Sequence, residues 1–218
     1  MAEYAAFDET EDGSMSEKSQ ETLEAAQTAI KDPALLKTVV DALAGASRRA
    51  RQNSAAILSE VAKEHADLLV PFEGELIDAL NRPEARTRWE CLDALTQLVD
   101  KDSRACDKAI AGAETSLFDE ESGPVRLAAL RFLCKIGATT ETRSEKTWPL
   151  IDEAIQCYHG DLEFGDMLVA VAEYSQGKLS DSVKASLAQR MAFDASNSKG
   201  SLQRRARQIL ENVGGSPA

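Results

Sequence analysis

Trp89 and Asp93 lie four residues apart in the segment RTRWECLDALTQLVD, residues 86–100, which has the apolar periodicity of an amphipathic helix. The apolar stripe of that helix consists of Cys91, Leu95 and Leu98. At about 100° per residue, Trp89 and Asp93 point together to the opposite side of the helix. An indole and a carboxylate on a face that is not needed for the core suit binding, since tryptophan is enriched among the residues that dominate interfaces.

Catalytic or metal chemistry has less support among the residue types. The chain has two histidines, His65 and His159, and a metal site usually needs clustered ligands. The four cysteines are Cys91, Cys106, Cys134 and Cys157, and no two of them form a C-x-x-C pair. The sequence also contains no phosphate-binding glycine loop and no nucleophile elbow. We therefore expect no catalytic residue, no metal and no cofactor.

The charge and hydropathy of the chain limit its partners. The net charge is -12. This charge disfavours nucleic acid as a partner, because a protein that binds nucleic acid gains most of its affinity from contacts of lysine and arginine with phosphates. No apolar run approaches the ~20 residues that a membrane span needs. The first residues are acidic, unlike a signal peptide. We expect a cytoplasmic protein without membrane attachment, and we make no prediction of its oligomeric state.

A repeat of 37 to 39 residues organises the sequence. Its anchor positions, spaced by 37, 38, 38 and 39 residues, are Leu58, Leu95, Leu133, Val171 and Leu210. Seven residues before the first three anchors stand Arg51, Arg88 and Arg126, whereas Phe164 and Gln203 occupy this position in the last two units. A second amphipathic helix precedes each anchor helix. Because a single helix pair cannot bury its apolar stripe, the pairs must stack as a solenoid.

The segment VRLAALRFLCKIG, residues 125–137, resembles the second helix of a HEAT repeat, and ARQNSAAILSEV and TRWECLDALTQL resemble weaker copies of it. The resemblance covers residues 33 to about 213. It implies an all-α, right-handed solenoid of about five HEAT-like hairpins, an armadillo-type fold. The expected hairpins span residues 33–70, 71–101, 102–138, 144–176 and 180–213.

The ends of the chain differ in composition from the repeats. Residues 1–32 carry a net charge of -7, from nine acids and two lysines, so the other residues sum to -5. We expect a disordered acidic tail over residues 1–15, a repeat domain with an N-terminal capping helix over 16–213, and a frayed end over 214–218. The tail either solvates the protein or contacts a basic surface, such as the patch of Arg204, Arg205 and Arg207.

The HEAT resemblance also implies that the second helices line a concave groove. Residues equivalent to Trp89 and Asp93 give that groove an apolar middle with charged neighbours and polar ends. The predicted binding residues are Trp89, Asp93, Leu127, Arg131, Val169 and Arg204. Cys134 is expected on the groove side, where its thiol is a candidate for reactivity. Trp89 has a second interpretation, in which its indole fills the seam between neighbouring helices.

The repeated arginines have a simpler interpretation. We expect Arg51, Arg88 and Arg126 on the flank of their helices to link adjacent repeats through hydrogen bonds or ion pairs. Most proteins that resemble this one bind other proteins through the concave face. The resemblance therefore implies a non-catalytic interaction module or scaffold, with another protein or a peptide as its partner.

One enzyme group keeps an alternative open. HEAT-like alkylpurine DNA glycosylases carry a tryptophan and an aspartate one helical turn apart, with an arginine in the next repeat. Trp89, Asp93 and either Arg126 or Arg131 resemble that arrangement. The alternative is therefore a DNA-binding repair protein, although the predicted groove offers few cations for phosphates.

Overall fold

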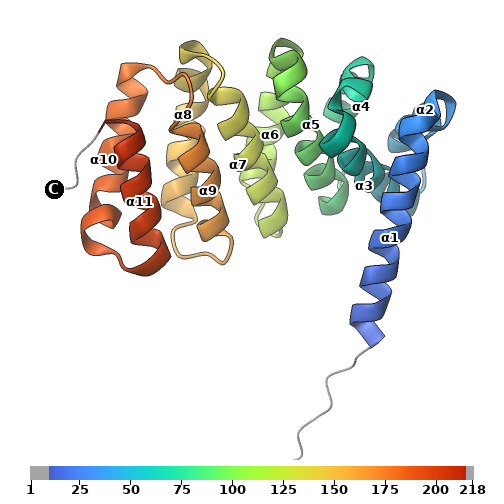
Figure 1. Ribbon diagram of the computed structural model, residues 1–218, viewed down its shortest axis with the longest axis horizontal. Helices are drawn as coiled ribbons and strands as arrows, with labels where there is room; N and C mark the ends of the chain where they lie inside the picture. Colours follow the sequence, from blue (N-terminus) through green and yellow to red (C-terminus); the bar gives the residue numbers. More distant parts are fainter. Residues whose placement is uncertain (1–9, 215–218) are drawn as a thin grey trace, which may run out of the picture.

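The computed structural model describes the backbone of residues 10–214 and the side chains of residues 20–214. Over these residues the regular elements are helices, separated by short turns (Figure 1). Three are short 3-10 helices: η1 (Ala42–Ala44), η2 (Ala66–Phe72) and η3 (Asp107–Ala109). The α-helices are α1 (Thr10–Lys31), α2 (Pro33–Asp41), α3 (Arg48–His65), α4 (Glu73–Ala79), α5 (Ala85–Cys106), α6 (Ile110–Leu117), α7 (Gly123–Gly137), α8 (Glu141–Cys157), α9 (Phe164–Tyr174), α10 (Asp181–Asn197) and α11 (Gly200–Asn212).

The helices stack as successive hairpins along the long axis of the molecule (Figure 1). The second helices of the hairpins are α3, α5, α7, α9 and α11, and each one packs against the next. The first helices are α2, α4, α6, α8 and α10. Helix α1 packs against α2 and α3 at one end, while α10 and α11 form the other end. The chain is therefore an all-α solenoid of about five hairpins with an N-terminal capping helix, as its repeats predicted.

Helix α1 begins earlier than the sequence indicated. The disordered tail was expected to reach residue 15, but residues 10–15 belong to α1, and the rest of the expected tail lies outside the described residues. Acidic residues are favourable near a helix N-terminus, where they interact with the positive end of the helix dipole. A run of acids is thus compatible with a helix start as well as with disorder.

Helix boundaries follow the capping residues in the sequence. The side chain of Asp32 accepts hydrogen bonds from the backbone N–H groups of Ala34 and Leu35, and Pro33 begins α2. Ser180 accepts from the N–H of Val183 at the start of α10, as expected for an N-cap. These bonds satisfy donors that a helix N-terminus leaves without an internal partner.

Asp102, rather than the neighbouring Ser103, provides the N-cap after the kink in α5. Its backbone leaves the helical region at φ -144° and ψ 76°, which kinks α5, and its carboxylate accepts from the N–H of Ala105. The Ser103 hydroxyl instead accepts a hydrogen bond from Arg143 in α8. Neighbouring candidate caps are hard to distinguish from sequence because both side chains can accept the same bond.

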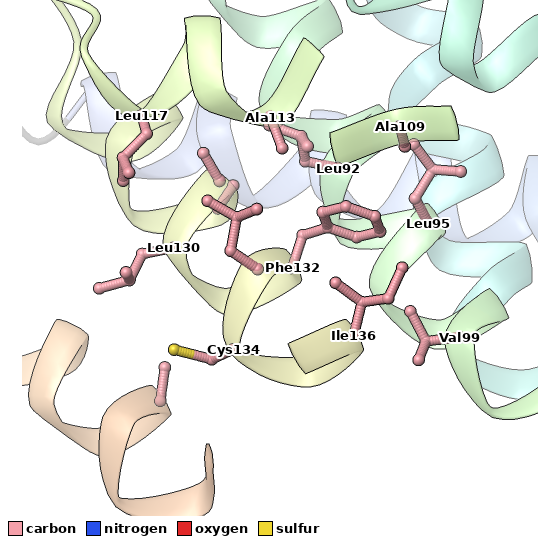
Figure 2. Close-up of a cluster of buried hydrophobic side chains, with 14 of the residues drawn as sticks. Leu92, Leu95, Val99, Ala109, Ala113, Leu117, Leu130, Phe132, Cys134 and Ile136 are labelled. Atoms are coloured by element: carbon pink, nitrogen blue, oxygen red, sulfur yellow. The ribbon is translucent and has the colours of Figure 1, made fainter. Parts of the chain in front are cut away.

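The core lies between the helices of each hairpin and continues from one hairpin to the next. Phe132 of α7 is fully buried against α5 and α6 (Figure 2). Its buried surroundings include Leu92, Leu95, Ala109, Ala113, Leu117 and Ile136. Burying a side chain of this size contributes about 1.5–3 kcal/mol to the stability of the fold.

Among the described helices, none is long and apolar enough to cross a bilayer.

Ion pairs also connect the hairpins, and they confirm the linking role predicted for the repeated arginines. Each arginine of a second helix bonds an acid in the turn before the next second helix. The pairs are Arg51–Glu84, Arg88–Asp119 and Arg126–Glu163. We call these arginines the junction arginines. Hydrogen bonding by Arg51 lowers the pKa of Glu84 below its usual range.

Candidate binding site on the second-helix face

A cleft of about 540 Å³ opens between α5, α7 and α9, on the face formed by the second helices. We call it the central cleft. Polar and charged walls are provided by Thr96, Gln97, Arg131, Lys135 and Glu173. Its less polar lining consists of Cys134, Ala138, Val169, Ala170 and Tyr174. Cleft walls that combine an apolar base with a few polar groups are typical of surfaces that bind ligands.

The structure brings two of the predicted binding residues together in this cleft. Arg131 is exposed on α7, and Val169 is partly buried on α9. Leu127 does not line the cleft. It is partly buried and packs against the core. Arg204 is exposed on α11, one helix beyond the cleft. The predicted set is therefore a row along the second-helix face rather than one compact site.

Trp89 falls between its two interpretations. Its indole is partly buried and packs against the hydrophobic core, yet part of it remains exposed. It belongs to the same helical stripe as Gln97, eight residues later, which lines the central cleft. The indole thus packs against the core and keeps a partly exposed surface, two helical turns from the Gln97 side of the cleft.

Asp93 lies within electrostatic range of charged residues on three helices. Burial raises the pKa of its carboxyl to about 6, and the nearby Glu60 and Glu90 act in the same direction. Arg131 and Lys63 oppose that rise. Asp93 is therefore a partly buried carboxylate whose charge the cations of α3 and α7 compensate only in part.

Four charged or polar residues of the central cleft were not predicted from the sequence: Thr96, Gln97, Lys135 and Glu173. Gln97, Lys135 and Glu173 lie four residues after Asp93, Arg131 and Val169, one turn further along the same helical stripes. Lys135 also forms an ion pair with Asp100, with Nζ 2.8 Å from Oδ2. The sequence did contain a signal for Gln97, Lys135 and Glu173, because extending the same spacing by one turn on each helix identifies them.

Cys134 lies on the expected side, but its thiol is not suited to reaction. Its side chain points away from Phe132 (Figure 2), and it lines the central cleft while remaining only 2% exposed. Burial raises the pKa of the thiol, which keeps it protonated and weakly nucleophilic. Among the residues whose side chains are described, no group of three or more histidines, cysteines or acids is placed to hold a metal ion.

Comparison with solved structures agrees with this architecture. A designed armadillo repeat protein in complex with the peptide (KR)4 has a TM-score of 0.73 at 14% identity, covering 89% of this chain and 91% of that one. Computationally designed armadillo repeat proteins for modular peptide recognition have a TM-score of 0.70 at 18% identity, covering 94% of each chain. The chain has an armadillo/HEAT-like repeat fold.

A natural protein shares this armadillo/HEAT-like fold. The archaeal HEAT-like repeats protein from Thermococcus onnurineus NA1 has a TM-score of 0.59 at 17% identity, covering 91% of this chain and 79% of that one. No family model and no curated protein sequence matches the chain. At such low identities the likeness establishes the fold and leaves the function to be argued from the site.

Proposed function

We propose that this chain is a non-catalytic interaction module that binds a protein or peptide segment along its second-helix face, the concave face of an armadillo/HEAT-like solenoid. The observation that carries this proposal is the central cleft, which three consecutive second helices build together. A site of this kind suits an extended segment, because equivalent positions recur at each hairpin and can contact successive residues of a ligand.

The side chains of the second-helix face suit a ligand that combines charged and apolar groups. Arg131 and Glu173 present opposite charges from facing helices, and Val169 lies in the lining shared by α7 and α9. Trp89 adds partly exposed aromatic area. Interfaces are dominated by a few aromatic and arginine side chains surrounded by polar groups. The designed armadillo relative that was solved with the peptide (KR)4 supports a peptide as the occupant.

The location that suits this function is the cytoplasm. The four cysteines are free thiols. Thiols persist in reducing compartments, whereas oxidising compartments favour disulfides. We place the protein in the cytoplasm on this ground.

The experiment is a peptide-display selection on the immobilised chain, followed by titration of the selected peptide. Arg131→Glu and Glu173→Lys should each weaken binding at least tenfold, since both reverse a charge in the central cleft. The matched controls are Lys146→Glu and Glu145→Lys, exposed reversals on α8. Equal binding by all four folded variants would reject the central cleft as the site.

The DNA-repair alternative gains no support from the geometry. Arg126 is already engaged by Glu163, and its guanidinium also lies over the Tyr158 ring at 4.9 Å. Asp93 has two further acids in its surroundings, Glu60 and Glu90, which repel phosphates. Duplex binding needs several cations along one continuous surface.

A further inference from the structure

The junction between the fourth and fifth hairpins differs from the earlier ones. Where the preceding second helices carry a junction arginine, α9 carries Phe164. Its ring lies 4.9 Å from that of His159, measured between centroids, and His159 Nε2 lies 3.3 Å from Asp194 Oδ1. In α9 the ring of Phe164 therefore takes the position that a junction arginine has in the earlier second helices.

A pocket of about 390 Å³ lies beside Phe164, between the starts of α9 and α11. We call it the end pocket. Its lining includes the apolar side chains of Phe164, Leu168 and Leu202, with Arg205 on the α11 side. Gly165 also lines it, and a Cβ built there would meet nothing within 4 Å. The equivalent positions of other second helices carry side chains, such as Trp89 and Leu127. The end pocket thus has room for an incoming side chain.

Two exposed apolar residues flank this region. Leu162 is 103% exposed and directly follows Asp161, a lining residue of the end pocket. Phe193 is 71% exposed and directly precedes Asp194, the hydrogen-bond partner of His159. The α8–α9 and α10–α11 connections lie at the same edge of the molecule (Figure 1). Exposed apolar side chains that neighbour pocket residues in the sequence are consistent with a protein-binding surface.

The cations on the α11 side of the end pocket favour acidic groups in a ligand. Residues 195–210 contain four cations and no acid, in a chain with a net charge of -12. The four cations are Lys199, Arg204, Arg205 and Arg207. The opposite side of the pocket carries two acids, Asp161 and Asp166, and Asp161 lies 3.6 Å from the Arg126 guanidinium. Acidic groups of a ligand would therefore face α11. An aromatic side chain in the pocket, with acids directed toward α11, would satisfy both parts of this surface.

The sequence of this chain contains such a segment. Residues 4–12, YAAFDETED, combine two aromatic residues with four acids and no cation. Phe7 lies three residues before α1, so it can reach only about 10 Å from that helix. Helices α3, α5 and α7 separate α1 from the end pocket, a span of roughly 35–40 Å at usual interhelical distances. The segment therefore cannot reach the pocket of its own chain.

We propose that the end pocket binds residues 4–12 of a second copy of this chain, with Phe7, which directly precedes the acids Asp8 and Glu9, in the pocket and the acids against the cations of α11. Such an association is head to tail. Heterologous contacts of this kind generate rings or open chains rather than a symmetric dimer. This site is separate from the central cleft and does not depend on what that cleft binds.

A labelled synthetic peptide of residues 1–15 tests the pocket directly. It should bind the full chain, and Gly165→Leu should weaken that binding at least tenfold by filling the space. Gly74→Leu in α4 is the matched control, since a Cβ at Gly74 also meets nothing within 4 Å. Circular dichroism and thermal unfolding verify that both variants fold. A peptide that fails to bind the unmodified chain, or that binds the Gly165→Leu chain equally well, would overturn the proposal.

Sedimentation of the full chain tests whether the bound segment belongs to a second copy of this chain. The mass should rise above 23.6 kDa with concentration, and either Phe7→Ala or Gly165→Leu should abolish this rise. An equimolar mixture of these two variants should form a one-to-one pair, because one keeps the pocket and the other keeps the segment. Arg131→Glu should still self-associate. A full chain that binds the peptide but stays monomeric would reject the second copy and indicate an acidic segment of another protein.

Discussion

The guanidinium of Arg126 and the carboxylate of Glu163 form an ion pair across the junction between the third and fourth hairpins, and each side chain is only 14% exposed. Arg126 also donates to the backbone carbonyl of Asp119. One arginine thus connects its own helix, the turn before it and the turn before the next second helix. Such a residue sets the position of one hairpin on the next.

Removing this arginine should destabilise the solenoid. Arg126→Met keeps the aliphatic stem but leaves Glu163 partly buried without its cation, which should cost about 2 kcal/mol in the free energy of unfolding. Lys37→Met is the control, because Lys37 and Asp41 form an exposed pair worth at most about 1 kcal/mol. Urea unfolding of both variants measures the difference. Equal losses of unfolding free energy in the two variants would show that the Arg126–Glu163 pair stabilises the fold no more than an exposed ion pair does.

Gly177 should tolerate no larger residue. A Cβ at this position would lie 2.5 Å from the Ala138 Cβ and 2.7 Å from its backbone oxygen. That oxygen also accepts a 2.8 Å hydrogen bond from the N–H of Lys178. Gly177→Ala should therefore lower the free energy of unfolding by about 1–3 kcal/mol. Gly74→Ala, where the added Cβ meets nothing within 4 Å, should change it by about 0.5 kcal/mol or less.

Asp93 should make stability depend on pH. Its pKa is raised from the model-peptide value of 3.8 to about 6, so the folded chain binds the proton more tightly than the unfolded chain. Stability attributable to this group therefore falls as the pH rises from about 4 to about 6, and the loss is complete above that range. Asp93→Asn should be more stable than the unmodified chain at pH 7.5, by up to about 3 kcal/mol.

The same substitution should have little effect at pH 4, where the native carboxyl is also neutral. Urea unfolding at both pH values provides the comparison. Lower stability of Asp93→Asn at pH 7.5 would mean that attraction to Arg131 and Lys63 outweighs the burial of the charge.

The fold was predictable from the sequence because its signal is periodic. Leu58, Leu95 and Leu133 recur at nearly constant spacing, and the structure buries all three completely. The junction arginines were predictable for the same reason, but their partners were not. Glu84, Asp119 and Glu163 follow their arginines by 33, 31 and 37 residues. The spacing varies because Glu84 and Glu163 directly precede α5 and α9, whereas Asp119 lies four residues before α7.

The candidate site was predictable only in part. Helical spacing placed Arg131 and Val169 on one face, and both line the central cleft. The same spacing could not show that Leu127 packs inward, since the depth of a side chain at the edge of a stripe depends on the crossing of neighbouring helices. The end pocket depends on the packing of α9 against α11, which sequence periodicity does not define.

Thiol chemistry should distinguish one cysteine from the other three. Cys157 is exposed, whereas Cys91, Cys106 and Cys134 are buried, and burial raises the pKa of these three thiols. A chromogenic disulfide reagent should therefore modify one thiol rapidly, and the remaining three only on unfolding. Cys157→Ser should eliminate the rapid phase. Rapid modification of any thiol in that variant would contradict the burial of Cys91, Cys106 and Cys134.

The central claim is that the second-helix face binds a peptide at the central cleft, and a nitrogen–proton NMR titration tests it most directly. The ¹⁵N-labelled chain is titrated with the peptide selected by display. We predict shifts of the Trp89 indole N–H and the Gln97 side-chain amide, both on the α5 stripe that leads into the cleft. Trp148 on α8 should remain unchanged, since it lies by a separate hollow with Asp152 and Arg190. Shifts of Trp148 without shifts of Trp89 and Gln97 would contradict the claim.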